Sequence, residues 1–288
     1  MCFLLRTAAI SFLFVAIKSS FAADPKLAAS LKELSEAYLT QRPASGLSTG
    51  MTYQAAIAAQ KEYVELLEKH FGKRAGYKVG LVTPAGQKRY QISHPIHGVL
   101  FEKMLLPDGS EVPVGYGTRP ILEPDLLVRV KDAAINDAKS AQQVMARLSE
   151  IICFIELADG TFATNAPVDA GVLTASNVGA RLGIIGQTRT VENTKEFFDA
   201  FGKMSLVLRD RDGKELSRVT ADGAMGHPMN ALLWFVEDLK KTGEKLKPGD
   251  VISLGSPSPQ VTPKAGEKFV LSYEGLPGGA IEAKVSFR

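Results

Sequence analysis

The spacing of apolar residues predicts two amphipathic helices at the beginning of the folded part of the chain. Apolar side chains recur at steps of three and four residues across 25–41 and again across 52–70, which is the period of one helix face. Between them, a segment with Pro43 and Gly46 interrupts the pattern. Thr52 is placed to cap the second helix.

From Tyr77 onward the pattern changes to short β-like runs separated by Gly, Pro and Asp. The predicted strands span 77–82, 98–101, 121–130, 151–157, 180–186, 204–210, 250–255, 268–275 and 280–287. Two further helices are predicted at 139–149 and 228–241, the second with Pro228 at its first position. Because no βαβ alternation occurs, we expect an α+β fold, with a helical N-terminal arm over 23–74 and a strand-rich domain over 75–288.

The first 22 residues have the layout of a secretory signal peptide. An early Arg6 precedes an apolar run from Ala8 to Ile17, and small residues end at Ala22. The apolar run is too short to span a hydrocarbon core of about 30 Å, which argues against a membrane anchor. We therefore expect cleavage after Ala22 and export, with the periplasm as the destination and no membrane association after cleavage.

Composition excludes some classes of protein. The 288 residues contain 34 Lys and Arg against 31 Asp and Glu, and 45% are hydrophobic, which argues against disorder and against a nucleic-acid binder with clustered basic charge. Removing residues 1–22 lowers the net charge from +3 to +1 and leaves Cys153 as the single thiol. No disulfide within the mature chain is then available, so burial must hold the fold together.

The most informative polar residues are three carboxylates in apolar strands. Glu123 and Asp125 are two residues apart and so face the same side of a strand, and Glu156 ends the next predicted strand. Together they could hold Mg²⁺ or Mn²⁺. The alternative is an exposed strand end, which Pro124 favours.

Other candidates carry weaker signals. Lys78, flanked by glycines, is either a solvent-facing charge or a buried proton relay. His94 and His97 bracket a proline, which favours a loop over a metal site. His227 precedes Pro228, where capping or loop packing is the expected role. The motifs of serine hydrolases, P-loop proteins and nicotinamide enzymes do not occur.

Seven sequence blocks, taken together, resemble a known family. The chain is similar to the 2-keto-4-pentenoate hydratases and 2-oxo-hepta-3-ene-dioate hydratases and decarboxylases of the fumarylacetoacetate hydrolase superfamily, from about Thr52 to Phe287. In order, the blocks are Gly76–Leu81, Pro95 with Gly98–Phe101, Glu123–Asp125, the strand ending at Glu156, Ala175–Asn177, Gly226–Ala231 with Trp234, and Lys247–Ser256.

The resemblance implies a fumarylacetoacetate hydrolase-like mixed β-roll, a homo-oligomer and a lyase of aromatic-compound catabolism that acts on a small 2-oxo acid. It implies Mg²⁺ or Mn²⁺ bound by Glu123, Asp125 and Glu156, which stabilises an enolate, and proton transfer by Lys78. It also implies substrate-binding roles at Ser176, Asn177, His227 and Ser256.

The chain departs from the family pattern near the expected site. Asp125 stands where a Glu is usual, Ile96 replaces an acid, and Ser176 and Gly179 replace an acid and a serine. We hypothesise that His97 supplies the missing proton-transfer group; alternatively it fills the space of the usual Phe. The sequence leaves four functions open. They are a hydratase or decarboxylase, a C–C bond hydrolase, a tautomerase, and a non-catalytic exported binding protein.

The signal-peptide interpretation predicts a defined mature N-terminus. When the full chain is expressed in a Gram-negative host, intact mass and N-terminal sequencing of the periplasmic protein should show a chain that begins at Ala23. Replacing Ala22 by Arg should block processing, because the peptidase requires a small residue there. Recovery of a soluble, uncleaved chain from the cytoplasm would contradict the prediction.

Overall fold

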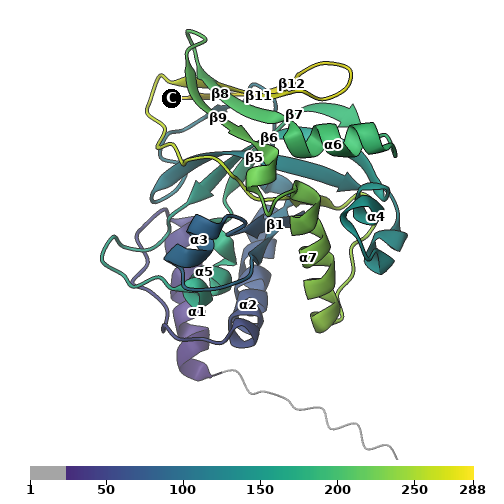
Figure 1. Cartoon of the computed structure of the whole chain (residues 1–288). Helices are drawn as coiled ribbons and strands as arrows, with labels where there is room; N and C mark the ends of the chain where they lie inside the picture. Colours follow the sequence, from purple (N-terminus) through teal and green to yellow (C-terminus); the bar gives the residue numbers. More distant parts are fainter. Residues whose placement is uncertain (1–23) are drawn as a thin grey trace, which may run out of the picture.

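The structure, a computed structural model, describes residues 24–288 and confirms an α+β fold with a helical N-terminal arm (Figure 1). The arm consists of α1 (Pro25–Leu39) and α2 (Tyr53–Phe71). The Thr52 hydroxyl accepts a hydrogen bond from the Ala55 N–H at 3.2 Å and so caps α2 as predicted. The proposed signal peptide, residues 1–22, lies outside the described residues.

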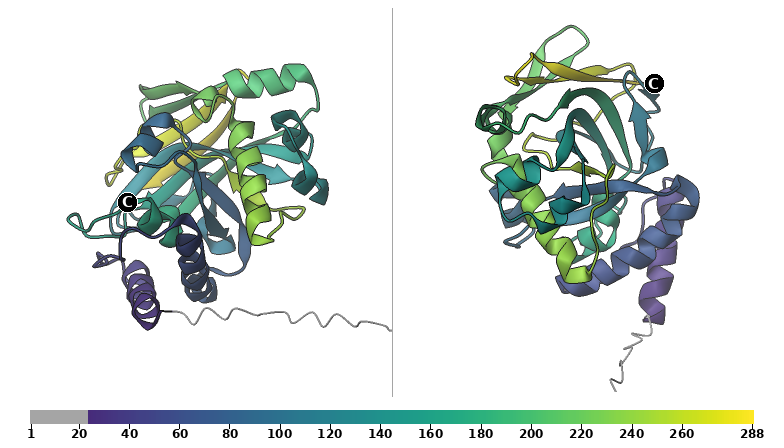
Figure 2. Two further views of the ribbon diagram at one scale, coloured as in Figure 1. Left: turned by 60° about the horizontal axis from the view of Figure 1, so that its bottom comes forward. Right: turned by 90° about the vertical axis from the view of Figure 1, so that its right-hand side faces the viewer.

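A seven-stranded mixed sheet forms the centre of the molecule, in the order β2-β1-β10-β5-β6-β7-β3. Its strands are β1 (Arg74–Gly80), β2 (Ile96–Phe101), β3 (Leu105–Pro107), β5 (Pro120–Val130), β6 (Leu148–Asp159), β7 (Leu182–Thr190) and β10 (Val251–Ser253). The pairs β1–β10 and β3–β7 are parallel and the other pairs are antiparallel. The strands curve strongly, as the right-hand view of Figure 2 shows.

A second sheet of five strands, in the order β4-β12-β11-β8-β9, packs on the first. Its strands are β4 (Glu111–Val112), β8 (Ser205–Asp210), β9 (Glu215–Thr220), β11 (Lys268–Glu274) and β12 (Ile281–Phe287). It lies at the end of the molecule opposite the helical arm (Figure 1). Contacts of β12 with β6 and β7 join the two sheets around a continuous apolar core.

In the part of the chain that the structure describes, five further helices and four 3₁₀ turns complete the fold. They are α3 (Pro84–Arg89), α4 (Ala141–Met145), α5 (Ala170–Ala175), α6 (Lys195–Lys203) and α7 (Pro228–Thr242), with 3₁₀ turns η1 (Glu102–Met104), η2 (Ala133–Asp137), η3 (Asn177–Gly179) and η4 (Ala221–Gly223). The α7 helix packs against β1, where Phe235 meets the Tyr77 ring edge-on at 4.9 Å between centroids. The α2 helix packs against α5 and β2.

None of the helices in residues 24–288 has the length and apolar character needed to cross a bilayer.

One predicted helix is much shorter than expected. The pattern over 139–149 predicted a helix, but only Ala141–Met145 is helical, and β6 already begins at Leu148. Leu148 pairs with Val130 at the end of the β5–β6 ladder. Pairing with the neighbouring strand therefore outweighs the local preference of these residues for a helix.

Close backbone approach explains one of the glycines beside Lys78. Gly76 pairs with Val251 in the parallel β1–β10 ladder, and a Cβ atom built on it would lie 1.8 Å from the Val251 carbonyl oxygen. Because a backbone atom cannot rotate away, only glycine fits here. The strand that carries Lys78 is thereby held tightly against β10.

Candidate active site

A cavity of about 860 Å³ opens beside the β5–β6 ladder, where β1 also reaches it. Glu123 of β5 lies directly opposite Glu156 of β6, so the two side chains share one face of the sheet. Both line the cavity, as does Lys78 of β1. The structure therefore brings together three of the residues that the sequence singled out.

Lys78 is almost completely buried and pairs with Glu156. Its Nζ atom forms an ion pair with a Glu156 carboxylate oxygen and donates a second hydrogen bond to the Val178 carbonyl at 3.0 Å. The side chains of Lys78 and Glu156 are 5% and 3% exposed. A lysine buried to this extent is not the solvent-facing charge that the sequence left open as an alternative.

The turn that supplies the Val178 carbonyl is strained and is held by Asn177. Asn177 and Val178 have φ angles of 60° and 54°, a left-handed conformation that is costly for a β-branched residue. The Asn177 amide oxygen accepts from the Val99 N–H at 2.6 Å, and its nitrogen donates to the Val99 carbonyl at 3.0 Å. Asn177 thus fixes the turn that orients Lys78 rather than lining the cavity itself.

Asp125 lies beside the cavity but does not line it. Its side chain is fully buried. One carboxylate oxygen accepts from the Leu126 N–H at 2.5 Å and the other from the Ser253 hydroxyl at 2.5 Å. These two donors hold the carboxylate in place. Asp125 is two residues from Glu123 along β5 and so is the next residue on the same sheet face.

Burial and mutual repulsion dominate the electrostatics of this cluster. Burial, followed by the neighbouring Glu156 charge, raises the pKa of Glu123 and raises that of Asp125 well above its usual range. Burial alone would lower the pKa of Lys78, but the Glu156 and Glu123 carboxylates outweigh it, so the Lys78 pKa is raised. One lysine faces three acidic side chains, and the cluster lacks positive charge.

The chemistry of this donor set fits a divalent cation. Carboxylate oxygens are the hard ligands that Mg²⁺ and Mn²⁺ prefer, and an added cation would supply the missing positive charge. Among residues 24–288 no three acidic, His or Cys side chains converge as a ready-made ligand cluster. The Asp125 carboxylate is turned toward Ser253 and Leu126. The carboxylate oxygens that already accept a hydrogen bond still have a further lone pair for a cation. Glu123 and Glu156, which line the cavity, and Asp125, which lies beside it, are therefore the residues that could hold the ion.

The four residues that the resemblance assigned to substrate binding separate into two groups. Ser256 lines the cavity; its hydroxyl donates to the Pro124 carbonyl at 2.6 Å. Ser176 and Asn177 are buried outside it, and the Ser176 hydroxyl donates to the Leu173 carbonyl at 3.1 Å. For these two the structure shows a structural role in place of substrate contact.

His227 also lies away from the cavity, and its substrate-binding role is corrected. Its Nδ1 atom accepts from the Met229 N–H at 3.1 Å and so caps α7, while its ring stacks on Phe198 at 4.0 Å between centroids. The capping role that its place before Pro228 suggested is the one observed.

His97 does not stand beside Lys78, which contradicts the hypothesis that it replaces the missing acid. It pairs with Val79 across β1 and β2, and neighbouring residues of a strand face opposite sides, so His97 and Lys78 lie on opposite faces of the sheet. The His97 ring faces Tyr77 and Phe235, and its Nε2 atom lies 3.4 Å from an Asp238 carboxylate oxygen.

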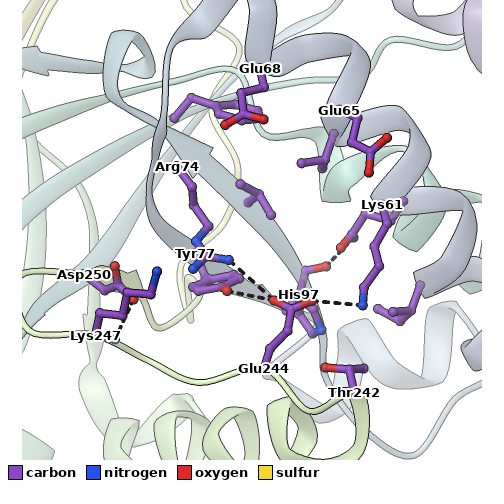
Figure 3. Close-up of a pocket in the computed structure, with 15 residues that line it drawn as sticks. Lys61, Glu65, Glu68, Arg74, Tyr77, His97, Thr242, Glu244, Lys247 and Asp250 are labelled. Carbon is purple, nitrogen blue, oxygen red and sulfur yellow. Dashed lines mark hydrogen bonds and ion pairs between the residues drawn. The ribbon is translucent and has the colours of Figure 1, made fainter. Parts of the chain in front are cut away.

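His97 instead lines a second cavity, of about 480 Å³, between α2 and the end of α7 (Figure 3). Glu244 dominates its polar contacts: it lies 3.0 Å from the Lys61 ammonium and 3.5 Å from the Arg74 guanidinium, and it accepts from the Tyr77 hydroxyl at 3.1 Å. The Glu244 carboxylate is thus paired with two cations at the protein surface.

Sequence reasoning missed several polar residues of the large cavity, namely Arg89, Tyr90, Arg119, Asp159 and Gln260. The Gln260 amide donates to a Glu123 carboxylate oxygen at 2.5 Å. Arg119 had a readable signal, since it lies four residues before Glu123 and directly precedes the same strand. Gln260 and Arg89 had none, because a loop and the short helix α3, both distant in sequence from Glu123, bring them to the cavity.

Comparisons with known proteins agree with the resemblance read from the sequence blocks. No family model matches the chain. The 2-keto-4-pentenoate hydratase of Burkholderia vietnamiensis is 24% identical over 257 residues, 89% of this chain and 95% of that protein. The structure of 4-oxalocrotonate decarboxylase from Pseudomonas putida, complexed with magnesium and adipate, superposes with a TM-score of 0.80 at 20% identity, over 91% of this chain and 97% of that one.

A more distant likeness has the same fold. The fumarylpyruvate hydrolase of Pseudomonas aeruginosa, in complex with Mn²⁺ and pyruvate, matches with a TM-score of 0.51 at 15% identity, over 75% of this chain and 90% of that one. The resemblance to the 2-keto-4-pentenoate hydratases and the fumarylacetoacetate hydrolase-like fold are confirmed.

The Asp238 carboxylate makes stability depend on pH. Burial raises its pKa, but interactions with His97, with the Tyr53 hydroxyl at 2.7 Å and with the Lys241 ammonium at 3.1 Å outweigh this and lower the pKa to about 2. Because the folded-state pKa is depressed from 3.8, the stabilisation is present above pH about 4 and is lost as pH falls toward 2. Asp238→Asn should therefore lower the free energy of unfolding by about 2 kcal/mol at pH 7.

Denaturant titration from pH 7 to pH 2 measures this effect. The difference between wild type and Asp238→Asn should shrink below pH 4. Glu237→Gln, on the exposed face of the same helix, serves as the control and should follow the wild-type curve. A difference between wild type and Asp238→Asn that stays constant over the whole pH range would show that the carboxylate's charge contributes nothing.

Proposed function

We propose that the protein is a metal-dependent lyase, a hydratase or decarboxylase, which acts on a small 2-oxo acid or 2-hydroxydienoate. The observation that carries this proposal is the pairing of a buried lysine with an excess of carboxylates at the wall of a large cavity. Such an arrangement lowers the stability of the fold in the absence of a cation. Buried, perturbed groups of this kind are typical of sites that bind ligands or transfer protons. The likeness to hydratases and decarboxylases supports the same chemistry.

Each part of the site has a role in this proposal. Glu123, Asp125 and Glu156 would hold Mg²⁺ or Mn²⁺, which supplies positive charge that offsets the charge developing on the 2-oxo oxygen of the substrate. The Ser253 hydroxyl and the Leu126 N–H keep the Asp125 carboxylate oriented. Ser256 and Gln260 line the cavity near Glu123 and would contact the substrate.

Lys78 is the proton-transfer residue of the proposal. Its Nζ atom is held by Glu156 and by the Val178 carbonyl, so the ammonium has a fixed direction. It would donate a proton to the substrate carbon once negative charge has moved into the enolate. The same step serves hydration and decarboxylation, and also the hydrolase and tautomerase alternatives, because all would pass through a stabilised enolate that must be protonated.

One observation favours a second candidate, an exported protein that binds 2-oxo acids without turning them over. Ile96 stands where the related hydratases carry an acid and is fully buried, and the neighbouring His97 lies on the sheet face opposite to Lys78. Export directed by residues 1–22 would also separate the protein from cytoplasmic catabolism. Under either candidate we expect a homo-oligomer.

Cation binding is the first test of the proposed site. Saturating Mg²⁺ or Mn²⁺ should raise the melting temperature, because a ligand at a hundred times its dissociation constant stabilises the folded state by about 2.7 kcal/mol. Adding oxalate as an enolate mimic should raise it further. Glu156→Gln should abolish both shifts.

The matched control is Glu150→Gln, on the same strand but paired with Arg129 away from the cavity. It should keep the full cation response. The proposal fails if neither cation shifts the melting temperature of the wild type at millimolar concentration. If cation and oxalate bind but a panel of 2-hydroxydienoates is neither hydrated nor decarboxylated, the binding-protein candidate holds.

A further inference from the structure

Arg119 presents a free, oriented guanidinium group at the rim of the large cavity. Its Nε atom donates to the Gly160 carbonyl at 3.0 Å, which fixes the plane of the group. Among residues 24–288 no carboxylate lies within 4 Å of the guanidinium nitrogens, and the two terminal nitrogens make no hydrogen bond. Its charge is therefore available to a ligand.

Local structure is arranged to hold this guanidinium in place. The backbone N–H of Arg119 donates to an Asp159 carboxylate oxygen at 2.8 Å. A Cβ atom on Gly160 would lie 2.8 Å from Arg119 Nε and 2.9 Å from one terminal nitrogen, so a side chain at residue 160 would displace the group. Gly160 thus makes room for Arg119 against β6.

Arg119 and the acidic cluster lie at opposite ends of one sheet face. Arg119 precedes the first residue of β5, and Glu123 follows four residues later, a separation of about 13 Å along an extended strand. Between them Ile121 pairs with Ala158, and both line the cavity. The cavity therefore has an acidic end at Glu123 and Glu156, an apolar floor, and a rim at which the Arg119 guanidinium lies beside the buried Asp159.

We propose that Arg119 selects dicarboxylic substrates by binding the carboxylate farthest from the 2-oxo group. This inference rests on the proposed function, which places the 2-oxo carboxylate at the acidic end. A substrate that spans the apolar floor would bring its second carboxylate to the guanidinium, whose two free terminal nitrogens match a carboxylate in a two-point hydrogen-bonded pair. Arg89 of α3 also lines the cavity and adds positive charge to it.

Two ligands that differ only at the far end test the inference. 2-Oxoadipate and 2-oxohexanoate have the same number of carbons, and only the first carries a second carboxylate. With Mg²⁺ present, calorimetry should show that the wild type binds 2-oxoadipate at least tenfold more tightly, the effect of a charge-assisted hydrogen bond. Arg119→Gln should remove this preference without changing the affinity for 2-oxohexanoate.

Two further variants keep the test interpretable. Arg119→Lys retains the charge but loses the two-point pairing, so it should keep only part of the preference. Arg211→Gln removes an exposed arginine of the β8–β9 turn and should leave the preference intact. Melting curves of each variant identify any loss of folding, and Arg119→Lys decides the outcome if Arg119→Gln does not fold.

The outcomes separate this inference from the proposed function. If the wild type binds both ligands in a Mg²⁺-dependent manner with equal affinity, the role of Arg119 is overturned and the proposed function stands. The same holds if the preference survives in Arg119→Gln. If neither ligand binds with Mg²⁺ present, the proposed function is overturned, and the inference with it.

Discussion

The burial of Lys78 among carboxylates is the interaction on which the rest of the site depends. A lone ammonium in this position would be strongly destabilising, and so would a lone carboxylate. Their pairing makes burial tolerable, yet the acids outnumber the lysine. The neighbouring structure is built around this imbalance: Ser253 and the Leu126 N–H hold Asp125, Gln260 holds Glu123, and the strained turn at Val178 offers a carbonyl to Lys78.

The alternation of side chains along β1 divides the molecule into two polar regions. Lys78 faces the large cavity, while Tyr77 faces the second cavity with His97. In the second region Glu244 meets Lys61 and Arg74, and Asp238 meets Tyr53 and Lys241. On the Lys78 face one buried ammonium group faces the carboxylates of Glu156, Glu123 and Asp125, and this buried excess of acid is the physical reason for placing the chemistry there.

Much of the architecture could be predicted from the sequence, because the arm helices and the long strands β5 and β6 have clear apolar periodicity. The shared face of Glu123 and Glu156 was less certain, since it depends on the register between strands. Register also explains why the placement of His97 beside Lys78 was wrong. A shift of one residue moves a side chain to the other face of the sheet, and no local sequence pattern determines the register between β1 and β2. Weakly patterned elements such as β9, whose side chains are mostly exposed, were missed for want of an apolar signal.

The residues that complete the cavity come from segments far apart in the chain, and no spacing rule links them. Gln260 reaches Glu123 from a loop 137 residues away in sequence, and α3 brings Arg89 to the rim. The Asn177 motif was recognised, but its role was not, because its contacts with the Val99 backbone become visible only once β2 is in place.

The most direct test of the central claim is turnover of 2-hydroxydienoates by the wild type and by Lys78→Met with Mg²⁺ present. Loss of the conjugated chromophore and release of CO₂ would be followed in parallel. We expect turnover that requires the cation and falls by about 10²–10⁴-fold in Lys78→Met, while the cation-induced rise in melting temperature persists. Turnover that is unchanged in Lys78→Met, or that proceeds equally well in a metal chelator, would contradict the claim.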